Sequence, residues 1–97
     1  MDFRVFYTKR SLNDLAAIVE RISIDSPNGA SGFSAALIDH IDLLANFPRM
    51  GARLPKRPGV RKLVHSPIVA YYRILTTRKV VEIIHLRHGS RVEPIRL

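Results

Sequence analysis

The chain has 97 residues, a hydrophobic content of 46%, a formal net charge of +8 and no cysteine. This length supports one hydrophobic core, so we expect a single domain over residues 1–97. The lack of cysteine excludes disulfides and thiolate metal sites, which favours a reducing, cytoplasmic location. The sequence has no signal peptide and no apolar run of about eighteen residues, so we expect no membrane span.

The net positive charge lies entirely in the second half. Residues 1–48 carry four basic and six acidic side chains, whereas residues 49–97 carry twelve basic and two acidic ones. The segment from Arg49 to Lys62 contains no acid and contributes six of these cations, namely Arg49, Arg53, Lys56, Arg57, Arg61 and Lys62. Such a loop is either simply solvated or functional. The bias of the whole half indicates attraction to an acidic polypeptide, to nucleic acid, or to a protein that handles nucleic acid.

The first half reads as a strand followed by two helices. Phe3, Val5 and Tyr7 alternate with Asp2, Arg4 and Phe6, which predicts a first strand. Ser11-Leu-Asn-Asp14 resembles a capping box and predicts the start of a helix. An apolar stripe then recurs at helical spacing, at Leu12, Leu15, Val19 and Ile22.

A second amphipathic helix follows a clear break. Ser26-Pro27-Asn28-Gly29 interrupts the first helix. The second stripe ends before Pro48 and consists of Phe33, Leu37, Ile41 and Leu44. A short break between two such helices predicts an antiparallel helical hairpin.

The second half reads as a loop and three strands. Residues 48–59 are rich in Pro, Gly and Arg, and strand-like runs follow at Val60–His65, Ile68–Leu75 and Val80–Arg87. Their short connections predict an antiparallel meander, with Pro67 in the first turn. The last two runs are apolar on both faces, so we expect the hairpin on one face and a partner on the other. The fold class is therefore α+β, in the order β-α-α-β-β-β, with a small meander sheet packed against the hairpin.

The polar residues offer little visible chemistry. His85 and His88 point in unlike directions, so we expect no metal and no cofactor, and His40 is expected at the surface. A metal-free ribonuclease needs a base, an acid and cations for the developing charge. The groups that could supply them are His65, Tyr71, Tyr72, His88 and Arg91, although at least one of the neighbouring tyrosines is expected to be packed.

Several segments together resemble the ParE/RelE superfamily of type II toxins. They are the first strand into Leu12-Asn-Asp14-Leu15, the Ser-Pro-Asn-Gly break, Leu43-Leu-Ala-Asn-Phe-Pro-Arg-Met-Gly51, Gly59-Val-Arg61, Tyr72-Arg-Ile74 and Val81-Glu-Ile-Ile-His-Leu-Arg-His-Gly-Ser-Arg91. The resemblance implies the RelE/ParE toxin fold. It also implies a cognate ParD-like antitoxin, whose acidic segment wraps the toxin in a hetero-oligomer.

Two branches of the superfamily imply different activities. RelE-like members cut messenger RNA on the ribosome with an arginine and a tyrosine whose positions correspond here to Val69 and Leu97, so that only Arg91 keeps a matching group. The C-terminal motif resembles ParE, whose members inhibit DNA gyrase by binding. We therefore expect a gyrase inhibitor without catalytic residues that touches nucleic acid only indirectly. The alternatives are an mRNA endoribonuclease that uses His65, Tyr72, His88 and Arg91, and a degenerate toxin that only binds its antitoxin.

The predicted contact surface is the C-terminal corner. His88, Arg91 and Arg96 are expected to contact the partner, supported by Arg61. Gly89 permits a bend there, and the planar fork of arginine pairs bidentately with carboxylates or phosphates. Arg91 could instead pair with Glu93 or Glu82 at the surface. The basic loop, with Arg49, Arg53, Lys56, Arg57 and Lys62, is the next candidate.

Overall fold

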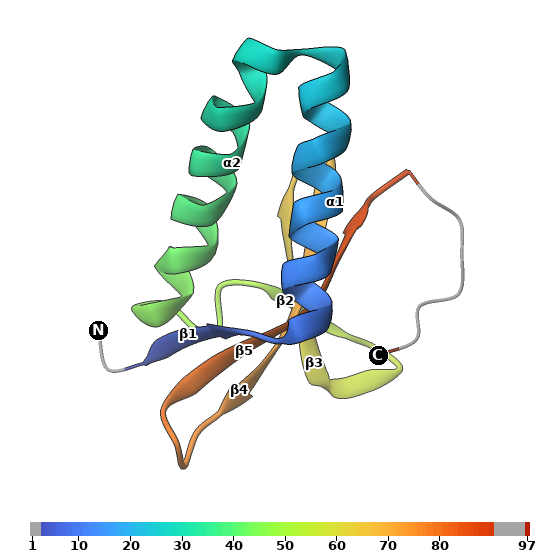
Figure 1. Cartoon of the computed structure of the whole chain (residues 1–97). Helices are drawn as coiled ribbons and strands as arrows, with labels where there is room; N and C mark the ends of the chain where they lie inside the picture. The colour runs from blue at the N-terminus through green and yellow to red at the C-terminus, as the bar shows by residue number, and fades with distance from the viewer. Residues whose placement is uncertain (1–2, 91–96) are drawn as a thin grey trace.

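The computed structural model describes residues 3–90 and 97, in which two helices pack on one five-stranded sheet (Figure 1). The elements in chain order are β1 (Arg4–Tyr7), α1 (Lys9–Asp25), α2 (Pro27–Asp42), the short 3-10 helix η1 (Leu43–Ala45), β2 (Ala52–Leu54), β3 (Arg57–His65), β4 (Ile68–Leu75) and β5 (Val80–His88). The strand order in the sheet is β1-β5-β4-β3-β2. The meander β2 to β5 is antiparallel, and β1 joins β5 in parallel.

The expected α+β fold with a helical hairpin on a meander sheet is confirmed, but the sheet has one more strand than predicted. β2 and the first residues of β3 lie in the segment that we expected to be a loop over residues 48–59. The pairing shifts between Arg53, which faces Arg61, and Leu54, which faces Arg57. Pro58 falls inside this irregularity, where its missing N–H removes no regular ladder bond.

The first helix begins earlier than predicted. Thr8 is the N-cap, since its Oγ1 accepts a hydrogen bond from the Ser11 N–H at 3.1 Å. The Ser11 hydroxyl donates back to the Thr8 carbonyl at 2.9 Å and is fully buried. The expected capping box from Ser11 to Asp14 is therefore wrong, because the preceding threonine already satisfies the first turn.

The helical hairpin turns more tightly than the sequence suggested. Only Ser26 separates the two helices, and the predicted break residues Pro27 to Gly29 form the first turn of α2. Proline is well suited to this position because a backbone N–H, which proline lacks, would have no helical partner there. Ala30 is buried near the turn.

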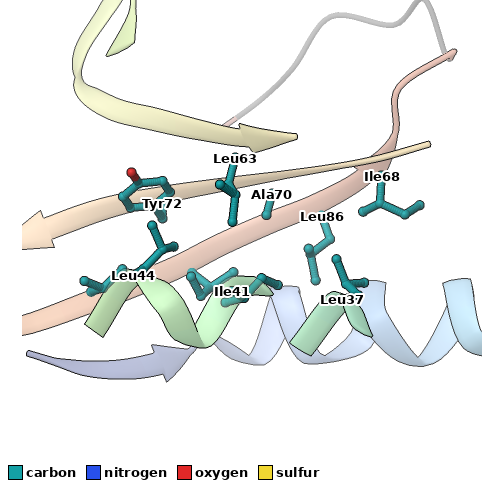
Figure 2. Packing of buried hydrophobic residues seen from close by; sticks show 10 residues of the cluster. Leu37, Ile41, Leu44, Leu63, Ile68, Ala70, Tyr72 and Leu86 are labelled. Carbon is teal, nitrogen blue, oxygen red and sulfur yellow. The ribbon is translucent and has the colours of Figure 1, made fainter. Parts of the chain in front are cut away.

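The main core lies between the hairpin and the sheet (Figure 2). Leu37, Ile41 and Leu44 meet residues from three strands, and Val5, Tyr7, Leu15 and Ile18 pack against this cluster. Its strand members are Leu63, Ile68, Ala70, Tyr72, Val81, Ile83 and Leu86. Leu12, expected on the buried stripe of the first helix, is instead 51% exposed.

The other face of the sheet has a smaller core of its own. Val60, Val69 and Tyr71 are buried there, and Leu54, Ile84 and Leu97 pack against them. The chain itself therefore covers part of the face for which we expected a partner. Tyr71 and Tyr72 are both packed, on opposite sides of the sheet. Among the helices of the described residues, none is long and apolar enough to cross a membrane.

Candidate functional site

Tyr72 anchors the turn that links η1 to β2. Its side chain is fully buried, its hydroxyl donates to the Pro48 carbonyl at 2.7 Å, and the same oxygen accepts the Gly51 N–H at 2.9 Å. Burial raises the pKa of Tyr72, against the opposing effects of the Gly51 N–H and the Arg61 charge. Both bonding directions of this hydroxyl are therefore taken up by the turn.

Arg61 and Gly51 complete this anchor. The Arg61 Nη1 donates to the Gly51 carbonyl at 2.8 Å and to the Arg49 carbonyl at 3.4 Å. A Cβ on Gly51 would lie 2.5 Å from the Lys62 carbonyl oxygen and 2.7 Å from the Tyr72 ring. Position 51 therefore has no space for a side chain larger than that of glycine. Arg61, which we expected to support partner binding, directs its guanidinium to main-chain carbonyls of its own chain.

The anchored turn presents large side chains to solvent. Phe47 is 59% exposed and Met50 is 42% exposed, and Arg49 between them is exposed as well. Together with Pro48 they line a shallow surface hollow. We call residues 47–50 the Phe47–Met50 platform.

The basic loop forms the β2–β3 hairpin. Arg53, Lys56, Arg57 and Lys62 are all exposed. The Arg57 Nη1 donates to the Leu97 main-chain oxygen at 3.3 Å, and Leu97 packs against the smaller core. The hairpin and the last residue of the chain therefore lie together, whereas Arg91 and Arg96 of the predicted corner lie outside the described residues.

The histidines of the ribonuclease hypothesis lie at one end of the sheet. His65 and His88 both face Ile68 in the strand register, and Tyr72 is four residues further along β4. His65 Nδ1 lies 2.9 Å from His40 Nδ1, and Phe33 contacts the His65 ring edge-on. His88 is exposed, with its Nδ1 2.6 Å from the Ser90 hydroxyl. The structure thus brings His65 and His88 to the same end of the sheet but keeps Tyr72 apart. His40, which we expected at the surface, is half-buried and contacts His65.

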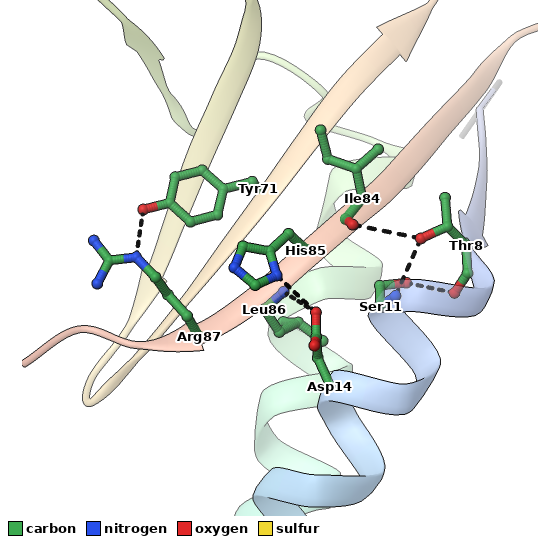
Figure 3. A network of polar contacts seen from close by, with 8 residues as sticks. All are labelled: Thr8, Ser11, Asp14, Tyr71, Ile84, His85, Leu86 and Arg87. Carbon is green, nitrogen blue, oxygen red and sulfur yellow. Dashed lines mark hydrogen bonds and ion pairs between the residues drawn. The ribbon is translucent and has the colours of Figure 1, made fainter. Parts of the chain in front are cut away.

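A polar clasp joins α1 to β5 (Figure 3). One Asp14 carboxylate oxygen lies 2.7 Å from His85 Nδ1 and accepts the Leu86 N–H at 3.0 Å. His85 stacks on Tyr71, whose hydroxyl accepts a hydrogen bond from Arg87 Nε at 2.9 Å. Within residues 3–90 and 97, no three His, Cys, Asp or Glu side chains gather in a way that could hold a metal ion.

Comparison with known proteins identifies the family. Residues 5–93 match the family described as the ParE toxin of the type II toxin–antitoxin system parDE. The chain belongs to the ParE toxin family. Among curated proteins, none matches this sequence.

Solved structures share the ParE toxin fold. A chain of the chromosomal ParDE system from P. aeruginosa superposes with a TM-score of 0.77 at 23% identity, covering 90% of this chain and 96% of that one. The toxin–antitoxin complex RelBE2 from Mycobacterium tuberculosis gives 0.67 at 22% identity, covering 91% and 99%. The isolated E. coli RelE toxin gives 0.68 at 18% identity, covering 94% and 88%.

Sequence reasoning missed two features of this ParE toxin. The Ser11-Leu-Asn-Asp14 pattern predicts a helix cap for Asp14, and the long sequence separation from His85 hides the contact between the two side chains. Phe47 and Met50 were treated only as parts of a motif. Their signal was two large apolar residues in a loop segment bounded by Pro48 and Gly51, where no strand or helix period requires their burial.

Proposed function

We propose that this ParE-family toxin acts by binding, as an inhibitor of DNA gyrase, in the cytoplasm. The observation that carries the proposal is the position of Tyr72. A group that transfers protons must reach the reacting atoms, but the Tyr72 hydroxyl is buried and bonded to Pro48 and Gly51. Val69 and Leu97 stand where the RelE resemblance implies an arginine and a tyrosine, which supports the same conclusion.

The proposed antagonist is a cognate ParD-like antitoxin with an acidic segment, bound in a hetero-oligomer. The uneven charge supports this partner. From Asp42 to Glu82 the sequence contains nine arginines and lysines between the two acids and no other acid. A segment with this excess of positive charge attracts an acidic polypeptide over long range.

The second candidate function is messenger RNA cleavage on the ribosome. One observation favours it, because His65 and His88 both pair with Ile68 and thus share one end of the sheet. Two histidines can serve as acid and base in a metal-free ribonuclease. His65, however, is already engaged with His40.

An induction experiment separates these functions. The toxin is expressed without antitoxin, and total RNA and plasmid topology are followed on gels, with purified gyrase tested in parallel. For the parent toxin we expect intact messenger RNA and a loss of supercoiling. The His65→Gln variant should be as toxic as the parent. Shortened messenger RNA with normal topology, and relief by His65→Gln, would establish the ribonuclease instead. Harmless expression with both gels unchanged would indicate a degenerate toxin.

A further inference from the structure

Exposed apolar side chains gather at one place on the described surface. Seven large hydrophobic residues are strongly exposed, and Leu43, Phe47 and Met50 among them fall within eight residues of sequence. Single exposed hydrophobic residues are ordinary in soluble proteins. A group of them beside charged residues instead marks an interaction surface.

Hydrogen bonds from Tyr72 and Arg61 fix the conformation of the Phe47–Met50 platform. The buried Tyr72 hydroxyl bonds to both Pro48 and Gly51, and Arg61 bonds to the carbonyls of Arg49 and Gly51. The missing side chain of Gly51 allows the turn to lie against the Tyr72 ring. A surface fixed before binding loses less conformational entropy when a partner arrives.

The charge around the platform defines the partner. Arg49 is exposed in its centre, and Arg53 follows on β2. Within the described residues, no carboxylate or hydrogen bond engages the Arg49 guanidinium, whereas Arg73 is neutralised by Glu82. An apolar hollow with an available arginine suits a segment that carries both a large apolar side chain and a carboxylate.

We propose that the Phe47–Met50 platform is a docking site for the acidic antitoxin segment, with one large apolar side chain of that segment between Phe47 and Met50 and a carboxylate on Arg49. The aromatic face and the flexible thioether supply a pocket that can adapt to the side chain. Tyr72 is a positioning residue that acts through the turn. The proposal rests on the proposed function for the existence of such a segment, and it adds the place where the segment binds.

The chain offers a matched control for the two apolar contacts. Phe6 and Val64 are 55% and 51% exposed, similar to Phe47 and Met50. Their neighbours in β1 and β3 pack against the core under the helices, so Phe6 and Val64 lie on the face of the sheet that is away from the helices. Calorimetry with synthetic peptides tiled across the cognate antitoxin measures the affinity of each variant. We expect the platform variant Phe47→Ala/Met50→Ala to bind at least about tenfold more weakly. The control Phe6→Ala/Val64→Ala should stay within about twofold of the parent.

The role of Tyr72 is tested with a double-mutant cycle. Tyr72→Phe keeps the ring in the core but removes both hydrogen bonds to the turn. We expect faster amide exchange at Gly51 and affinity lowered by roughly threefold or more. Added to the platform variant, Tyr72→Phe should cause almost no further loss of affinity, because its effect passes through the same side chains.

The outcomes distinguish the two proposals. Peptides that bind the parent and the platform variant equally, or a control variant that loses as much affinity, would show that the platform is not the docking site, and the proposed function would stand. A parent toxin that binds none of the antitoxin peptides would overturn the platform and the acidic partner together, while its effect on gyrase would still be measured by the supercoiling gel.

Discussion

At the scale of single residues, the surroundings decide what a side chain does. Tyr72 and Tyr71 are neighbours in β4, yet one hydroxyl bonds to main-chain groups of a turn and the other accepts from Arg87. Tyr7 differs from both. Its hydroxyl is buried without a hydrogen-bond partner among the described residues.

Tyr7 should make the toxin sensitive to alkali. Burial, with the Asp42 charge, raises the pKa of Tyr7 from 10.0 to about 12. Between these values the unfolded chain loses the proton and the folded protein keeps it, so stability falls as the pH rises through this window. In urea unfolding at pH 8 and pH 11, Tyr7→Phe should lose less stability between the two pH values than the parent does. Equal losses in parent and variant would contradict this assignment.

The same substitution has a second expected effect at pH 8. Tyr7→Phe removes a buried hydroxyl that has no partner, and such a group costs about 1–3 kcal/mol. The variant should therefore be at least as stable as the parent at that pH. All other titratable groups are the same in both proteins, so the comparison isolates Tyr7.

At the scale of elements, α1 bonds to the part of β5 that extends beyond its pairing with β1. β1 ends at Tyr7, opposite Ile83, and the Thr8 N–H bonds to the Ile83 carbonyl. Further along β5, the Asp14 carboxylate accepts the Leu86 N–H and contacts His85. The first helix thus satisfies strand groups that would otherwise need another strand.

Removing the Asp14 carboxylate should loosen this attachment. Asp14→Ala leaves the Leu86 N–H without its acceptor, and we expect it to lower the free energy of unfolding by about 1–3 kcal/mol in denaturant titration at pH 7. Asp14→Asn keeps an acceptor oxygen and should lose less. Glu20→Ala, on an exposed position of the same helix, should change stability by about 0.5 kcal/mol or less. An Asp14→Ala effect as small as that of Glu20→Ala would argue against the clasp.

The elements that the sequence predicted well are those with a long apolar pattern. In α2 the apolar residues recur at helical spacing because one face is buried, whereas β4 and β5 are apolar on both faces because both sides of the sheet carry a core. The strand β2 could not be predicted, since three residues beside Pro and Gly form a strand only by pairing with β3. Tyr72 shows the same limit for the site, because its hydrogen bonds to Pro48 and Gly51 join distant segments and leave no local pattern.

At the scale of the whole molecule, the charge distribution should govern how quickly a partner arrives. Arg53→Glu/Lys56→Glu reverses two exposed cations on the β2–β3 hairpin. We expect its association rate with the acidic antitoxin to fall by about tenfold or more at low salt and to approach the parent rate at high salt. Lys9→Glu/Arg21→Glu makes the same change on α1 and should have a smaller effect. Parent association that is independent of salt would contradict electrostatic steering.

The pairing of β1 with β5 also bears on how the toxin is made. Arg4 pairs with Val80, so β1, which is synthesised first, can pair only after β5 has been synthesised. The hairpin of α1 and α2 joins neighbouring segments and can form early on the ribosome, whereas contacts of long sequence separation form late. A nascent chain that stops at Leu75 leaves β1 without its neighbour and the hairpin without Val81, Ile83 and Leu86 beneath it. Incomplete translation products should therefore lack the folded toxin, which can form only when synthesis has passed through β5.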